Sequence, residues 1–248
     1  MHLDPLRKNL GNLEEFKRTE KLRDVKDALR RGQKVRFQEP EAVSTDLGLD
    51  WKLLYQRKKV ITNPEDWWME CARYAVDVTL DPETAHPNLI LSEDRKSVRW
   101  GDTRQNVPGN PGRFDTELCV LGCEGFTSGI HYWEVELGDV TGCKIGVCRD
   151  SVKRKGVSTQ SPEEGYFTLR LLNELRYVTL TSCVTPIPLS ETLQAVGIRL
   201  DNESGKVTFY DADNRSPLFT FMDFFMVEVR PFFYTYSRNP LRIRPVPG

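Results

Sequence analysis

The 248-residue chain lacks the apolar runs and the charge excess that mark membrane spans, secretory leaders and polyanion binders. No segment approaches the run of about 18 apolar residues that a transmembrane helix needs, and the N-terminus "MHLDPLRKNL" has no apolar core of a secretory signal. Lys and Arg number 35 against 36 Asp and Glu, so no global field calls for nucleic acid. We therefore expect a soluble, cytoplasmic polypeptide that does not bind nucleic acid.

Residues and motifs for metal binding and catalysis are also scarce. The chain has three histidines and no CxxC pair, whereas zinc needs about four closely paired ligands. Cys143 and Cys148 are five positions apart, and the six cysteines suit buried, reduced thiols better than a disulfide set. No GxSxG, P-loop or GxGxxG motif occurs, and His131 is the one histidine in a predicted strand. We expect no metal, no cofactor and no catalytic site.

The N-terminal part differs in composition from the rest of the chain. Residues 1–36 predict a charged helix with 11 Lys and Arg against 6 Asp and Glu, either solvated or facing an anionic membrane or a partner helix. Residues 37–50, "FQEPEAVSTDLGLD", predict a linker. Residues 51–75 predict a helical, aromatic segment that includes Trp67 and Trp68. Because so much aromatic surface is unfavourable when it is exposed to solvent, we expect this segment to dock on the domain that follows.

Residues 76–248 predict a mainly β domain, a two-sheet antiparallel β-sandwich. Short alternating runs such as "HYWEVEL", "KIGVC" and "AVGIRLD" are separated by turn residues at intervals of about 8 to 12 residues. "LDNESGKVTFY" predicts a hairpin. Alternation predicts this core: Trp133, Val135, Ile145, Val147, Leu169, Val196, Ile198, Leu200, Val207, Phe209, Phe219, Phe221 and Phe232.

Successive blocks of this region resemble a PRY-SPRY domain. They include "DVTLDPETAHPNLILSEDRKSVRWGD", "NPGRFD", "CVLG", "FTSGIHYWEVELGD", "IGVCRDSVKRKG", "SPEEGYFTLRL" and "RPFFY", in the order found in that family. The "LDPETAHP" and "IGVCRDSVKRKG" blocks look most like the cytoplasmic tails of butyrophilins, and the chain is also similar to tripartite-motif ubiquitin ligases. The resemblance implies a concanavalin-like sandwich that acts as a non-catalytic recognition module through loops at one edge.

The butyrophilin resemblance has further implications for function. Butyrophilins are membrane proteins that regulate T cells, so the chain would be an immunoregulatory module that binds a protein partner. It would reach the plasma membrane only through a missing span or a full-length parent. Two alternatives stay open: the substrate-recognition part of a tripartite-motif ubiquitin ligase, and a sensor of small pyrophosphate metabolites.

The pyrophosphate alternative depends on a basic pocket that some butyrophilin domains contain. Here three positions depart from that pattern: Ile130 replaces an arginine, Cys143 replaces an aromatic residue, and "GFW" becomes "GYF" with Phe167. Phosphate binding needs several converging cationic donors, and several basic residues are present here that could supply them. As the recognition surface we predict Tyr132, His131, Lys144, Arg149, Arg170, Phe167 and the loop "GNPGRFD", with Arg113 exposed beside a buried Phe114.

Overall fold

The computed structural model describes residue 69 and residues 71–173, 176–181, 184–189, 191–223, 225 and 227–245. The segments predicted at 1–36 and 37–50, and most of that at 51–75, lie outside the described residues, including Trp67 and Trp68. A helical turn at 71–73 precedes the β domain. Among the described residues, no helix is long and apolar enough to cross a membrane.

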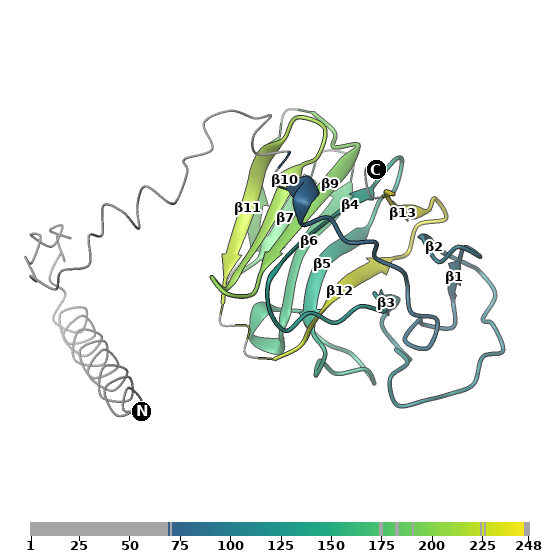
Figure 1. Cartoon of the computed structure of the whole chain (residues 1–248). Coiled ribbons are helices and arrows are strands. Elements are labelled where there is room, and N and C mark those ends of the chain that lie inside the picture. The colour runs from purple at the N-terminus through teal and green to yellow at the C-terminus, as the bar shows by residue number, and fades with distance from the viewer. Residues whose placement is uncertain are drawn as a thin grey trace, which may run out of the picture. The chain divides into compact units, whose positions relative to one another are not determined.

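The described chain folds into two antiparallel sheets, which confirms the predicted sandwich (Figure 1). One sheet has seven strands in the order β1-β2-β13-β4-β9-β10-β11, and the other has six in the order β3-β12-β5-β6-β7-β8. The strands are β1 (Leu89–Leu91), β2 (Ser97–Trp100), β3 (Cys119–Leu121), β4 (Ile130–Glu136), β5 (Cys143–Arg149), β6 (Tyr166–Asn173), β7 (Arg176–Leu180), β8 (Val184–Ile187), β9 (Ala195–Asp201), β10 (Lys206–Asp211), β11 (Ser216–Met222), β12 (Val229–Thr235) and β13 (Leu241–Ile243), and a 3-10 turn η1 (Pro162–Glu164) precedes β6.

The core lies between the sheets and contains the inward-facing half of each central strand. Trp133 and Val135 of β4 meet Ile145 and Val147 of β5 in one large buried cluster. All predicted core residues are buried except Phe219, which is only partly buried on the edge strand β11. Phe232 is buried in a second cluster. The strand alternation therefore predicted burial almost completely.

The chain enters the domain along β4. Val76 N–H donates to the carbonyl of Tyr132 at 2.9 Å, and Tyr132 N–H donates to the carbonyl of Tyr74 at 2.8 Å. The strand β13 pairs with β4 only at Val135 and Glu136, so residues 74–76 occupy the edge of β4 that β13 leaves open. Backbone hydrogen bonds thus fix the entering segment to the seven-stranded sheet.

Turn chemistry and cysteine state agree with the sequence. The predicted hairpin joins β9 to β10, with Asp201 opposite Lys206 and Gly205 at a φ of 63°. The Asp201 carboxylate accepts the Ser204 N–H at 2.9 Å and closes the turn. Cys119, Cys143 and Cys148 are buried free thiols, and Cys123 is exposed.

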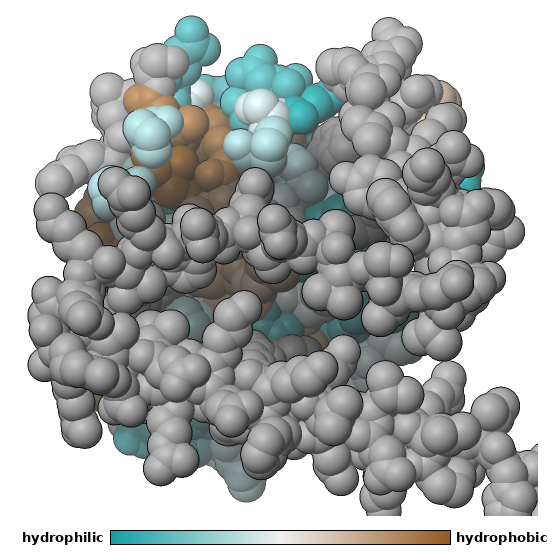
Figure 2. Space-filling model, turned by 90° about the vertical axis from the view of Figure 1, so that its left-hand side faces the viewer, coloured by the Kyte–Doolittle hydropathy of each residue, from teal (hydrophilic) through white to brown (hydrophobic). Residues whose placement is uncertain are grey.

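The side of the molecule on which β11 lies carries an apolar area. Figure 2 shows it as a brown region bordered by hydrophilic residues. β11 pairs only with β10, so it is an edge strand of the seven-stranded sheet. Its terminal residue Met222 is 73% exposed, while Leu218 and Phe219 are partly buried against the core.

Candidate functional site

The outer face of the six-stranded sheet brings two cations into register. On β5 and β6, Lys144 stands directly opposite Arg170, while their inward-facing neighbours Ile145 and Leu169 also pair across the strands. Like charges placed directly opposite each other in a sheet destabilise it by about 0.2–1 kcal/mol. The sheet therefore carries an unfavourable pair that folding does not require.

Lys144 is half-buried although it is charged. Its ammonium donates to Oε1 of Gln160 and lies 5.0 Å from the centroid of the Tyr234 ring. Burial lowers the pKa of Lys144, and the nearby Arg170 charge lowers it further. Arg170 itself is exposed. The pair presents positive charge to solvent beside an aromatic ring.

Gln160 is held in a conformation that few residues adopt. Its φ is 54°, in the left-handed region, and its side chain is 1% exposed. Its N–H donates to Ser158 Oγ and Glu164 Oε2, each at 3.1 Å, and its Nε2 donates to Glu117 Oε2 at 3.3 Å. A non-glycine residue in this region costs on the order of 1–3 kcal/mol and persists where its surroundings fix it. Here the result is an amide oxygen fixed against Lys144.

A second hydrophobic cluster covers another part of the same outer face. Tyr234 packs against this cluster, which fixes the aromatic ring that lies beside Lys144. Burial raises the pKa of the Cys119 thiol well above its ordinary value, so this cysteine stays protonated and unreactive at neutral pH. The members of the cluster are Phe114, Cys119, Leu121, Cys148, Val152, Tyr166 and Phe232.

Two of the predicted site residues lie on the other sheet. Tyr132 is 2% exposed, and its hydroxyl donates to Glu134 Oε1 at 2.7 Å on the outer side of the seven-stranded sheet. Burial, and then the Glu134 charge, raise the pKa of Tyr132. His131 stacks on Phe126 with ring centroids 3.9 Å apart, and its Nε2 lies 2.8 Å from the Ser128 carbonyl oxygen. Neither side chain joins Lys144 and Arg170.

Phe167 and Arg149 lie at the interior and the edge of the sandwich. Phe167 is 1% exposed and makes edge-to-face contacts with Phe221 and Phe225, so it is not a surface residue. Arg149 forms an ion pair with Asp223 at 2.9 Å and lies 5.9 Å from the Phe167 ring centroid. The predicted set therefore does not converge: only Lys144 and Arg170 share the outer face of the six-stranded sheet.

The prediction that Arg113 is exposed is wrong. Arg113 is 5% exposed, and its guanidinium donates to the carbonyl oxygens of Pro108, Pro82 and Ala85 at 3.0, 2.6 and 2.8 Å. These carbonyls belong to segments with few ladder hydrogen bonds, and a buried carbonyl needs a donor. The neighbouring Phe114 is buried, as predicted.

Sequence reasoning missed Tyr234, Gln160 and Glu117. A signal existed for Tyr234, because alternation in "RPFFYTY" places it on the face opposite Phe233. Gln160 and Glu117 lie in segments without periodicity, so no pattern in the sequence could place them. In the part of the chain that the structure describes, no cluster of His, Cys, Asp and Glu could hold a metal ion.

Comparisons with known proteins identify the domain. A family model for the SPRY-associated domain matches residues 78–126, and a model for the SPRY domain matches residues 130–244. Human butyrophilin subfamily 1 member A1 is 48% identical over 182 residues, covering 72% of this chain and 34% of that protein. Mouse E3 ubiquitin-protein ligase TRIM58 is 39% identical over 225 residues, covering 91% and 44%. Human zinc finger protein RFP is 39% identical over 267 residues, covering 100% and 52%.

The chain thus spans between a third and about half of the length of these relatives. Among solved structures, the TRIM65 PSpry domain superposes with a TM-score of 0.61 at 23% identity, covering 83% of this chain and 100% of that one. The stonustoxin structure gives a TM-score of 0.61 at 27% identity, covering 69% and 29%. The arrangement of strands and the two matched models agree: the chain belongs to the PRY-SPRY family.

Proposed function

We propose that this chain is a non-catalytic protein-recognition module that binds an acidic segment of a partner protein on the outer face of the six-stranded sheet. The supporting observation is the Lys144–Arg170 pair, which opposes two like charges at adjacent strands. The relatives of the family are intracellular and membrane proteins of several kinds, and domains of this class generally bind proteins.

The chemistry of the face favours a carboxylate ligand. An approaching carboxylate relieves the repulsion between Lys144 and Arg170, and an arginine can bind it with two parallel hydrogen bonds. Tyr234 offers an aromatic surface beside the charges, a combination that is common in the centres of protein interfaces. Gln160 fixes the lysine in place, so little order is lost on binding.

Proximity labelling in cells tests this proposal. The full chain is compared with Lys144→Glu/Arg170→Glu and with the matched double reversal Arg99→Glu/Arg242→Glu, whose exposed arginines lie on the seven-stranded sheet. We expect a set of acidic neighbours to be lost with the first variant and kept with the second. Equal loss in both variants, or in neither, would contradict the proposed surface.

The parent protein is a separate matter, and one observation favours the ligase alternative. The tripartite-motif relative TRIM58 and the protein RFP align over 91% and 100% of this chain, whereas the butyrophilin alignment covers 72%. The N-terminal residues therefore have counterparts in those proteins. On this ground we propose that the module selects substrates for ubiquitination. The immunoregulatory role and the cytoplasmic location remain predictions.

The ligase alternative has its own readout. If the module selects substrates, its labelled neighbours should carry fewer ubiquitin remnants when the gene for this chain is deleted, and should become more abundant. A butyrophilin-like role predicts no change in either quantity. The surface proposed above is independent of this outcome.

The pyrophosphate alternative can be separated by calorimetry. Glu117 is linked to Lys144 through Gln160, and its negative charge opposes a multiply charged diphosphate more strongly than a single carboxylate. We therefore expect no saturable heat when an isoprenoid diphosphate is titrated into the full chain at low salt. Saturable binding that weakens with salt and disappears in Lys144→Ala would make a phosphorylated metabolite the ligand of this face.

A further inference from the structure

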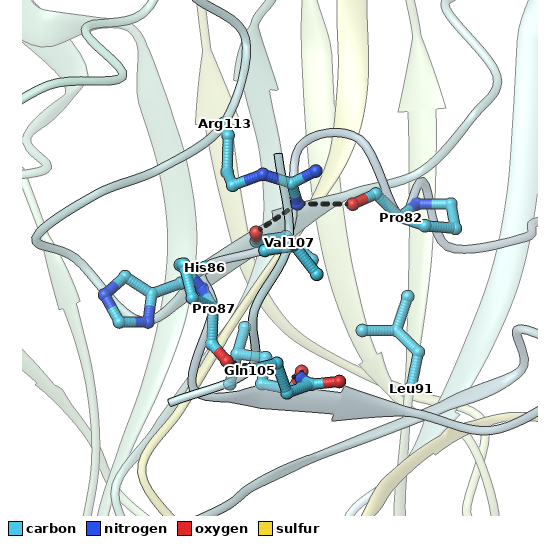
Figure 3. A pocket seen from close by; sticks show the side chains of 9 residues that line it. Pro82, His86, Pro87, Leu91, Gln105, Val107 and Arg113 are labelled. Atoms are coloured by element: carbon cyan, nitrogen blue, oxygen red, sulfur yellow. Dashed lines mark hydrogen bonds between the residues drawn. The ribbon is translucent and has the colours of Figure 1, made fainter. Parts of the chain in front are cut away.

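A second concave site lies in the segment that precedes β3, away from the Lys144–Arg170 pair. It is a pocket of about 140 Å³ between the turn before β1, β1 itself and residues 105–113 (Figure 3). A cavity of roughly 150 Å³ in an apolar protein interior is large enough to hold benzene. The pocket therefore has room for one medium-sized aliphatic side chain.

Six of the nine residues that line the pocket are apolar, although polar groups contribute at least as much of the exposed lining. Pro82, Pro87, Leu89, Leu91 and Val107 line it, and Leu91 and Val107 are only half-buried. Proline and branched aliphatic walls offer no hydrogen bonds, so they favour an aliphatic group by removing its surface from water.

One end of the pocket carries a buried positive charge with donors to spare. Arg113 uses Nε for the Pro108 carbonyl and Nη1 for the carbonyls of Pro82 and Ala85. Its Nη2 makes no hydrogen bond with any described residue. Nη2 forms a long ion pair with the Glu83 carboxylate at 3.6 Å, beyond hydrogen-bond distance, and the Glu83 side chain is 76% exposed. Figure 3 shows the guanidinium above the cavity and Gln105 below it.

The other polar groups at the pocket already form hydrogen bonds within the domain, except the Gln105 Oε1. Gln105 Nε2 donates to the carbonyls of Pro87 and Leu89 at 3.3 and 2.5 Å, which leaves its Oε1 as an acceptor. His86 Nδ1 accepts the Asn88 N–H, and its Nε2 donates to the Asp115 carbonyl. Burial lowers the pKa of His86, so the ring is neutral at neutral pH and adds no charge.

From this geometry we infer that the pocket binds a peptide group consisting of an aliphatic side chain next to a carboxylate, with the carboxylate on Arg113 Nη2. A charge-assisted hydrogen bond to a largely buried guanidinium is stronger than a neutral one, and the Gln105 Oε1 can accept a peptide N–H. The carboxylate can belong to a chain terminus or to an Asp or Glu beside the aliphatic residue. This inference goes beyond the proposed function, because no lining residue belongs to the Lys144–Arg170 face.

Methyl NMR of the full chain, labelled at Leu and Val, tests the inference with three peptides. The first is Gly-Gly-Gly-Leu with a free C-terminus, the second is the same peptide amidated, and the third is a capped, amidated peptide with Asp beside Leu. We expect saturable shifts of the Leu89, Leu91 and Val107 methyl groups with the first or the third peptide, and about tenfold weaker binding of the second. Which of the two carboxylate peptides binds identifies the source of the carboxylate.

Three variants make the result specific. Val107→Trp fills the cavity and should abolish the shifts while the methyl spectrum elsewhere stays folded. Glu83→Gln removes the carboxylate that competes for Nη2, so it should tighten binding several-fold. Its amide oxygen can still accept the hydrogen bond from Asn110, so the loop should keep its position. Glu93→Gln makes the same change at an exposed position outside the pocket and should have no effect. Equal binding of all three peptides, absence of saturable shifts at the lining methyl groups, or no response to Glu83→Gln would overturn the inference.

Discussion

Two groups of charges on the outer faces of the sandwich differ in their partners. On the seven-stranded sheet, Arg244 contacts Glu134, Glu136 and Asp213 at 2.9, 3.3 and 3.0 Å, and Tyr132 donates to Glu134. On the six-stranded sheet, Arg230 also pairs with carboxylates, Asp81 and Asp150, whereas Lys144 faces Arg170 and neither forms an ion pair with a described carboxylate. The Arg244 group holds the fold, whereas the Lys144–Arg170 pair stays available for a ligand.

The comparison predicts that the arginine on the first face is structural. Arg244→Ala leaves the nearly buried Glu134 without its cation, and an uncompensated buried charge costs about 3 kcal/mol. We expect the free energy of unfolding to fall by that amount in urea denaturation. Arg170→Ala, on the other face, removes an exposed side chain together with its repulsion with Lys144, so it should not lower the free energy of unfolding by more than about 0.5 kcal/mol. Equal losses of unfolding free energy in the two variants would contradict the claim that Arg244 is structural and Arg170 is not.

The first face also depends on one close approach of backbone and side chain. A Cβ on Gly197 would lie 2.4 Å from the Tyr132 hydroxyl oxygen and 2.9 Å from the ring. Gly197→Ala must therefore displace a buried tyrosine and break its bond to Glu134, at a cost of about 1–3 kcal/mol. Thermal unfolding measures the loss. A Gly197→Ala protein as stable as the wild type would mean that Tyr132 packs loosely.

The second face should gain stability when its charge is removed. Arg170→Met keeps much of the apolar stem, removes the repulsion with Lys144 and leaves the bond from Lys144 to the buried Gln160 intact, so we expect unfolding to become more costly by up to about 1 kcal/mol. Urea denaturation at neutral pH measures the difference. Destabilisation by a similar amount would show that Arg170 is not held in an unfavourable position beside Lys144.

The same pair gives a small pH effect whose sign is fixed. The pKa of Lys144 is lower in the folded chain than its ordinary value of 10.5. Between the pKa of the folded chain and that of the unfolded chain, Lys144 therefore binds more protons in the unfolded chain than in the folded one. Stability contributed by this group therefore rises with pH in that window. The stability difference between Arg170→Met and the wild type should shrink as the pH approaches 10.5, because the repulsion disappears when Lys144 loses its proton. A difference that is constant or grows would contradict the direction of the shift.

The sequence predicted the fold well because burial in a sheet alternates with every second residue. Alternation separates the buried Ile145 from the half-buried Lys144 on β5, and the structure confirms it. On β4 it assigns Trp133 and Tyr132 to different faces, but both side chains are buried. It also places Phe167 on the same side as Leu169, so the expectation that Phe167 lies at the surface conflicted with the pattern itself.

The site could be predicted only in part, because alternation does not say to which sheet a strand belongs. β4 and β5 are neighbours in sequence but lie in different sheets, so Tyr132 and Lys144 point away from opposite sides of the sandwich. The burial of Arg113 depends on carbonyl oxygens from distant loops, whereas the left-handed backbone of Gln160 is fixed by Ser158 and Glu164 in its own irregular loop. No periodic pattern in the sequence carries that information.

The most direct test of the account is a binding isotherm of the full chain and its Lys144→Met/Arg170→Met variant with the acidic segment of a partner found by labelling. The account predicts that the variant stays folded and binds at least about tenfold more weakly, a loss of about 1.4 kcal/mol. It also predicts that the wild-type affinity falls as salt is raised. Unchanged affinity in a folded variant would contradict the claim that this face recognises its partner through the two cations.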